Sequence, residues 1–201
     1  MAHYFILIGL ALLAGCGPKN SDFEWQGSDL EADRTSEFQL HPNEKPTPKT
    51  MFVMAKILAG QGKYAQSEAL LKQLVQEFPK FTPAYIKLAD LQMAQRRVPE
   101  TIRTIDAGLK LEPRNDILIN NLGMCYFVIG DYPRALAGFT QAAGINPENT
   151  RYRSNLALVL GVMGRQEESA SLYEQVLSPQ DAKHNVQVLI QAREKLQPSV
   201  N

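Results

Sequence analysis

Two cysteines and three histidines are the residues of this 201-residue chain whose chemistry could define a site. Cys16 directly follows an uncharged, mostly apolar stretch, residues 4–15, whereas Cys125 lies far along the chain. A thiol at the end of such a stretch is placed for covalent modification, and a single remaining cysteine leaves no disulfide framework. The histidines have no metal-ligand spacing, so we expect no metal site; they are His3, His41 and His184.

The apolar stretch is about half as long as the roughly 20 residues that a membrane-spanning helix needs, which favours the core of a secretory signal. It ends in Leu13-Ala14-Gly15-Cys16, which resembles the lipobox of bacterial lipoproteins. The resemblance implies that residues 1–15 are a signal peptide and that Cys16 carries acyl chains such as palmitate; we expect no other cofactor. The next residue is Gly17 rather than Asp, which by the same resemblance implies the outer membrane, facing the periplasm.

Residues 16–47 have the composition of a flexible acidic linker. From residue 17 onward this segment has seven acidic and three basic residues, whereas the rest of the chain has 14 acidic and 18 basic residues. One interpretation is a solvated spacer that extends away from an anionic membrane. In the other interpretation, the large apolar residues of the linker dock onto the folded domain or onto a partner; these residues are Phe23, Trp25, Leu30, Phe38 and Leu40.

A period of 34 residues organises the remainder of the chain, and it is marked by Pro79, Pro113 and Pro147. The third block reads Ile119-x-x-Leu122-Gly123-x-x-Tyr126, then Ala135-x-x-x-Phe139, then Pro147, which resembles the tetratricopeptide repeat. The sequence therefore predicts an all-α tetratricopeptide-repeat solenoid with four helix pairs over residues 48–181. A closing helix and tail are predicted over residues 182–201, because the last step of the repeat shortens from 34 to 30 residues.

Residues in register within the repeats have predictable roles. Small residues would let the two helices of a pair approach closely; they are Ala55, Ala89, Gly123 and Ala157. Glycines would end the first helix of each pair; they are Gly62, Gly130 and Gly164, with Arg96 in the second block. The closing helix would cover the fourth repeat with Val186, Leu189, Ile190 and Leu196, and would turn Lys183, Gln187, Arg193 and Glu194 to water.

The first helices of a tetratricopeptide solenoid line its concave groove, and the resemblance implies that ligands bind there. This row is mostly apolar, as expected for a groove that takes an amphipathic helix. Its predicted members are Phe52, Lys56, Ile86, Asp90, Met93, Asn120, Met124, Phe127, Val128, Ser154, Leu158, Val162 and His184. The alternative is that some of them are core. Asn121 and Asn155 match a frequent consensus asparagine, so hydrogen bonding within the fold competes with ligand contact at those positions.

Other function classes find no support. The Lys and Asn pattern with which some family members grip acidic C-terminal peptides is absent. No nucleophile elbow or glycine-rich phosphate loop is present, so we predict no catalytic residue and no enzyme, and no small-molecule substrate. Cys125 is expected to be buried and inert. The charge of the repeats is too modest and dispersed for nucleic acid.

A finer resemblance rests on "NLALVLGVMGRQEESASLYEQVL" followed by "DAKHNVQVL". The Asn-Leu-Ala-Leu helix, the Gly-Arg turn and the shortened step resemble the TadD family of lipoproteins from tight-adherence (Flp/Tad) pilus systems. Membership would imply a pilotin-like protein that binds the secretin through its groove. The alternatives are a periplasmic scaffold that docks cell-wall enzymes or other envelope assembly factors, and a cytosolic secretion chaperone. The sequence leaves homo-oligomerisation open.

Overall fold

The computed structural model describes residues 45–196 of the chain, with side chains through Gln191. The predicted signal peptide, Cys16, most of the linker and the side chains of Arg193, Glu194 and Leu196 lie outside the described residues. Within the described residues there are nine helices and no strand, which confirms the all-α prediction. None of these helices is both long and apolar enough to cross a membrane.

Two compact units make up this part of the chain, and the boundary falls between Phe81 and Thr82. The first unit contains α2 (Pro48–Gly60) and α3 (Tyr64–Glu77). The Thr47 side chain accepts a hydrogen bond from the Thr50 amide and so caps α2. The buried Ser67 hydroxyl donates to the Ala55 carbonyl oxygen at 2.7 Å, which fixes the two helices against each other.

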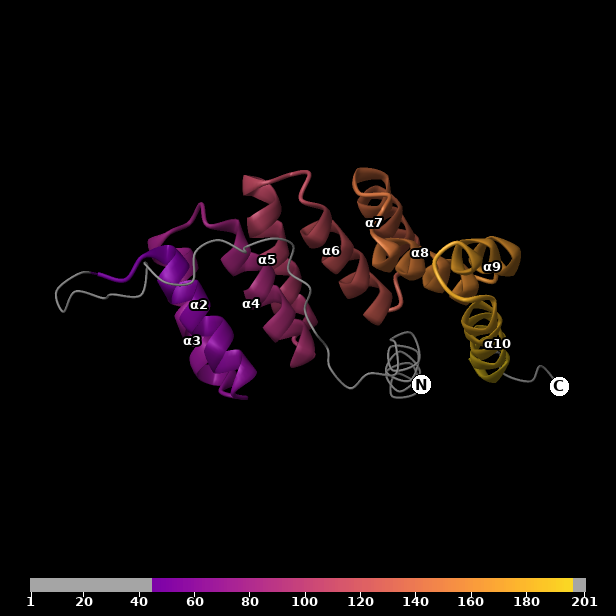
Figure 1. Cartoon of the computed structure of the whole chain (residues 1–201), viewed down its shortest axis with the longest axis horizontal. Coiled ribbons are helices and arrows are strands. Elements are labelled where there is room, and N and C mark those ends of the chain that lie inside the picture. The colour runs from indigo at the N-terminus through magenta and orange to yellow at the C-terminus, as the bar shows by residue number, and fades with distance from the viewer. Residues whose placement is uncertain (1–44, 197–201) are drawn as a thin grey trace. The chain divides into compact units, whose positions relative to one another are not determined.

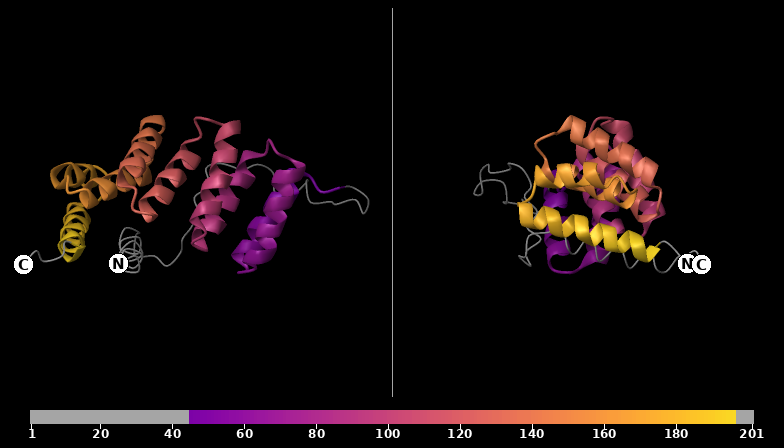
Figure 2. Two further views of the ribbon diagram at one scale, coloured as in Figure 1. Left: turned by 180° about the vertical axis from the view of Figure 1, so that it is seen from behind. Right: turned by 90° about the vertical axis from the view of Figure 1, so that its right-hand side faces the viewer.

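The second unit contains the other seven helices (Figure 1). They are α4 (Thr82–Ala94), α5 (Val98–Leu111), α6 (Asp116–Val128), α7 (Tyr132–Ile145), α8 (Thr150–Val162), α9 (Gln166–Glu174) and α10 (Pro179–Leu196). Each helix packs against the next one along the chain, and α4, α6, α8 and α10 also contact one another in succession (Figure 2). This is the stacking of helix pairs that the repeat predicts.

The turn inside each helix pair requires a left-handed residue. Its φ is +75° at Gly62, +81° at Gly130 and +87° at Gly164, and Arg96 takes the same conformation with a φ of +60°. In the third pair the Gly130 amide donates to the Phe127 carbonyl and the Asp131 amide donates to the Tyr126 carbonyl, which is a Schellman motif. Equivalent bonds occur in the other three pairs. The register of glycines predicted this turn, and Arg96 adopts it without glycine's freedom.

Between the second helix of one pair and the next pair, proline sets the boundary. Helices α3, α5 and α7 each end two residues before a proline; these prolines are Pro79, Pro113 and Pro147. A residue that precedes proline is displaced from the helical region, so the helix stops. The fourth pair lacks this proline, and α9 has nine residues where α3, α5 and α7 have 14. The shorter α9 explains the shortened step, and α10 begins at Pro179, three residues before the predicted position.

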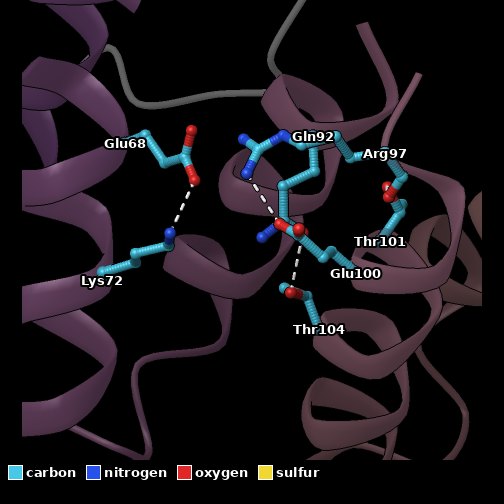
Figure 3. Close-up of polar contacts among 7 residues, drawn as sticks. All are labelled: Glu68, Lys72, Gln92, Arg97, Glu100, Thr101 and Thr104. Carbon is cyan, nitrogen blue, oxygen red and sulfur yellow. Dashed lines mark hydrogen bonds and ion pairs between the residues drawn. The ribbon is translucent and has the colours of Figure 1, made fainter. Parts of the chain in front are cut away.

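Polar side chains form hydrogen bonds and ion pairs on the second helices of each unit (Figure 3). In the first unit, Lys72 Nζ and Glu68 Oε1 form an ion pair of 2.8 Å along α3. In the second unit, the Thr104 hydroxyl donates to Gln92 Oε1 at 2.7 Å, which joins α5 to α4. The Arg97 guanidinium donates to Glu100 Oε2 at 2.6 Å in the first turn of α5.

Close helix contact depends on small residues, as predicted. Ala55, Ala89 and Ala157 are at most 1% exposed. A Cβ on Gly123 of α6 would lie 2.9 Å from the Phe139 ring on α7, and a Cβ on Gly138 of α7 would lie 3.0 Å from the Gly123 Cα. The two glycines therefore face each other where α6 and α7 are nearest.

We expect Gly138→Ala to lower the free energy of unfolding by about 1–3 kcal/mol, because the new methyl meets backbone atoms that cannot turn aside. Gly144→Ala is the matched control in the same helix, since a Cβ there meets nothing within 4 Å. Its higher helix propensity should leave stability unchanged or raise it by up to about 1 kcal/mol. Urea denaturation of both variants measures the difference, and equal stabilities would contradict the close approach.

Candidate functional site

The predicted groove residues of the second unit lie on α4, α6, α8 and α10. Because these helices contact one another in succession, side chains that point along the stack are covered by the next helix. Ile86 is 9% exposed, Phe127 6% and Leu158 3%. Ile86 packs with Leu118 and Cys125, while Phe127 and Leu158 belong to one core cluster with Phe139 and Tyr173. The prediction that these three side chains form part of an open groove is therefore corrected: they are core, the alternative that the sequence left open.

Seven of the predicted residues remain accessible in the second unit, and we call them the first-helix surface. They are Asp90, Met93, Met124, Val128, Ser154, Val162 and His184. Met124, Val162 and Val188 are half-buried and pack against the core cluster that contains Phe127 and Leu158. Val128 is 39% exposed at the end of α6. The structure thus offers a shallow apolar strip with polar residues beside it, in which methionine can adapt to a bound side chain.

A chain of hydrogen bonds runs beneath this surface from helix to helix. Asn121 Nδ2 donates to Asp90 Oδ1 at 3.0 Å, linking α6 to α4, and Asn155 Nδ2 donates to Asn120 Oδ1 at 2.8 Å, linking α8 to α6. Asn120 is only 5% exposed. These amides are occupied within the fold, and Asn120, predicted as a groove residue, acts here as a bond between repeats. A buried amide with a partner stabilises the stack and leaves little to offer a ligand.

Asp90 is the carboxylate of the first-helix surface, and its pKa differs from the usual value. Burial raises its pKa from 3.8 to about 6, although Lys87, the Asn121 hydrogen bond and Arg151 act in the opposite direction. A group that titrates near pH 6 changes the charge of the surface within the physiological range. Nothing in the sequence indicates this shift, because it depends on how the folded chain buries Asp90.

The two groove residues predicted in the first unit lie together on α2. The Phe52 ring contacts Phe81 edge-on, with centroids 5.5 Å apart, and the exposed Lys56 Nζ lies 5.9 Å from the centroid of the Phe52 ring. Phe52 is half-buried, so the cation and the ring edge are both accessible.

A second depression, of about 530 Å³, lies between α7, α8 and α9. Its apolar lining comes from Leu136, Leu156, Leu160 and Leu172, which are buried or half-buried. Arg165 and Glu168 lie at its edge and bond to each other at 2.6 Å. Sequence reasoning missed it, because each leucine alone fits the pattern of an ordinary core position.

The one cysteine among the described residues is not a reactive thiol. Cys125 is fully buried, and burial together with the nearby Asp106 raises the pKa of its thiol to about 12, so it is not a nucleophile at neutral pH. In residues 45–191 no group of three metal-ligating side chains comes together. The accessible surfaces of the described helices combine apolar and polar side chains, which suits them to binding another protein.

We expect the unfolding free energy of the native chain to fall as the pH rises from about 4 to 6. The folded state holds the Asp90 proton more tightly than the unfolded state, so stabilisation present below pH 4 is lost as Asp90 ionises. A shift of about two pKa units corresponds to roughly 2–3 kcal/mol. Asp90→Asn retains an acceptor for Asn121 and should remove this slope and raise the Tm at pH 7.

Urea denaturation between pH 4 and 8 measures both quantities. The control is Asp106→Asn, which changes an exposed aspartate of α5 and should leave the slope in place. An Asp90→Asn variant with the native slope would contradict the assignment.

Comparison with known proteins agrees with this geometry. The tetratricopeptide repeat family matches residues 58–123. An uncharacterised protein, y4yS of Sinorhizobium fredii (strain NBRC 101917 / NGR234), is 29% identical over 164 residues, covering 82% of this chain and 85% of its own. Among solved structures, pilF of Pseudomonas aeruginosa is similar with a TM-score of 0.62 and 20% identity, over 74% of this chain and 70% of its own.

YrrB, described as a tetratricopeptide-repeat protein with an unusual peptide-binding site, has a TM-score of 0.57 and 14% identity, over 77% of this chain and 88% of its own. At such identities the solved structures establish the fold alone. Residues 58–123 thus match the tetratricopeptide repeat, and the described helices have the fold of solved tetratricopeptide-repeat structures.

Proposed function

We propose that this protein is a lipid-anchored adaptor of the outer membrane that serves the assembly of a Tad-type pilus or secretion apparatus. In this role it is pilotin-like and binds a segment of the secretin through the first-helix surface. The observation that carries the proposal is the strip of accessible Met124, Val128 and Val162 on successive first helices, above a fully packed core. Exposed apolar strips of this kind take the apolar face of an amphipathic segment.

Two further points support parts of this proposal. The peptide-binding site named for YrrB indicates that the fold is suited to holding a peptide. The short α9 and early α10 are the structural counterpart of the shortened step on which the resemblance to TadD rests. Membrane attachment rests on the lipobox resemblance at Cys16, which lies outside the described residues.

A general periplasmic scaffold that docks cell-wall enzymes or other envelope assembly factors is the second candidate. It would use the same anchor and the same first-helix surface, so the identity of the bound protein is what separates the two.

The anchor is tested by intact-mass measurement of the protein purified from its native envelope. We expect a mature chain that begins at Cys16 and carries acyl chains, because a thioether and an acylated amino terminus give the two or more chains that stable anchoring needs. Cys16→Ser should leave the chain unlipidated and uncut, whereas Cys125→Ala, at a buried position, should be lipidated normally. Gly17→Asp should move the protein to the inner-membrane fraction. A native chain without acyl groups would overturn the anchor and favour the cytosolic chaperone.

The first-helix surface is tested with a Met124→Glu, Val128→Glu double variant in detergent pull-downs from native envelopes. Two carboxylates on the strip should abolish capture of the outer-membrane secretin, since burying them against an apolar segment is costly. The matched control is Leu111→Glu, which changes an apolar residue, 40% exposed, at the end of α5. It should capture the secretin as the native protein does, with circular dichroism confirming that both variants are folded.

Capture of cell-wall enzymes instead of a secretin, lost in the double variant, would assign the scaffold function to the same surface. Capture of the secretin by all three proteins would retain the partner and exclude this surface.

A further inference from the structure

Helix α2 has apolar side chains on two faces, and only one of them is buried. Met51 and Ala55 pack inside the first unit at 2% and 0% exposure. On the other face Val53 is 36% exposed, Met54 45% and Ile57 50%, with a spacing that places all three on one side of the helix. We call these three residues the α2 face. It differs from the part of α10 with described side chains, residues 179–191, where every exposed residue after Pro179 is polar; these residues are Gln180, Asp181, Lys183, His184, Gln187 and Gln191. The end helix of a repeat array usually has a polar outer side, whereas α2, the first described helix, exposes these three apolar residues beside Lys49 and Lys56.

The segment of the chain that contains α2 is positively charged. Residues 45–67 contain four lysines and no carboxylate. All four lysines are exposed; they are Lys45, Lys49, Lys56 and Lys63. A partner for this face must therefore supply large apolar side chains together with negative charge.

We propose that residues 23–40 of this same chain cover the α2 face. The segment has the complementary composition: five acidic residues and one basic residue. Its large apolar side chains are Phe23, Trp25, Leu30, Phe38 and Leu40. The sequence left open whether these residues are part of a spacer or dock, and this proposal takes the docking alternative, with the first unit as the docking site.

The length of the connection permits this arrangement. Seven residues separate Leu40 from the start of α2 at Pro48, and an extended chain of that length spans about 25 Å. The 13 residues of α2 form a helix about 20 Å long. The segment therefore reaches every part of the face, and a tether this short gives an effective concentration on the order of millimolar.

Electrostatics argue against a second copy of the chain on the same face. A symmetric dimer buries the same patch of both subunits, which would bring the two sets of four lysines together. Like charges placed in this way are repelled, whereas the acidic segment neutralises them. This inference is independent of the partner proposed for the first-helix surface, which lies in the other unit.

Trp25 is the single tryptophan of the chain, so the native protein reports on its own segment. The experiment uses the full-length lipidated protein in detergent and measures Trp25 emission and its quenching by acrylamide. In the native protein we expect a blue-shifted emission that moves toward the red, with quenching increased several-fold, in Val53→Glu, Ile57→Glu. The matched control Ile129→Glu changes a residue 53% exposed in the other unit and should retain the native emission.

A charge swap tests the same contact without altering any packed residue. Lys49→Glu, Lys56→Glu should release Trp25, and adding Asp29→Lys, Glu31→Lys should restore the native emission, because only a direct pairing is rescued by reversing both partners. Emission that is the same in the native protein and in all variants would show that detergent or another site shields Trp25, and would overturn the proposal. A dimer by light scattering that Val53→Glu, Ile57→Glu converts to monomer would also overturn it, and would assign the face to a second copy.

Discussion

The near contact of the two helices within each repeat is the constraint on which the rest of this structure depends. Gly123 and Gly138 meet where α6 crosses α7, and no larger side chain fits at either position. Ala55 and Ala157 have the same role in their own repeats, and in each case a serine hydroxyl of the second helix bonds to the alanine carbonyl at 2.7 Å. A pair that is this close buries backbone as well as side chains, so the turn between its helices must be tight and must adopt the left-handed conformation found at every pair.

This packing determines how much of the apolar first-helix row is left for binding. A solenoid stabilises itself only through contacts between neighbouring repeats, so its first helices must bury part of their apolar surface against each other. Ile86, Phe127 and Leu158 serve that purpose, and Asn120 does so through a hydrogen bond. The accessible residues that remain are those directed away from the neighbouring helix. Residues that stabilise the stack and residues that remain accessible thus occupy neighbouring positions of the same helices.

The sequence was a good guide wherever a residue's role follows from its place in the repeat. The 34-residue period predicted the helix pairs, their turns and the small residues between them, because these are local requirements that each repeat must satisfy. The groove was predicted less well, since the same apolar position is core or surface according to how near the next first helix lies. The titration of Asp90 and the depression beside α9 could not be predicted, because both depend on side chains from three or more helices meeting in space. The boundary of α10 was displaced because α9, without the expected proline, ends early.

The first and last described helices differ in the side chains that they expose. Interior helices of the second unit pack against neighbours on both sides, whereas a helix at the end of the array has a neighbour on one side only. At the C-terminal end the composition changes: α10 places Ala182 and Leu189 in the core, and the exposed residues between Gln180 and Gln191 are all polar. Helix α2, the first described helix, exposes three large apolar side chains, and the segment of residues 45–67 that contains it has four lysines and no carboxylate. An uncovered apolar face is a cost that a soluble domain avoids, and the acidic, aromatic segment that directly precedes α2 is the part of the chain with the composition to remove it.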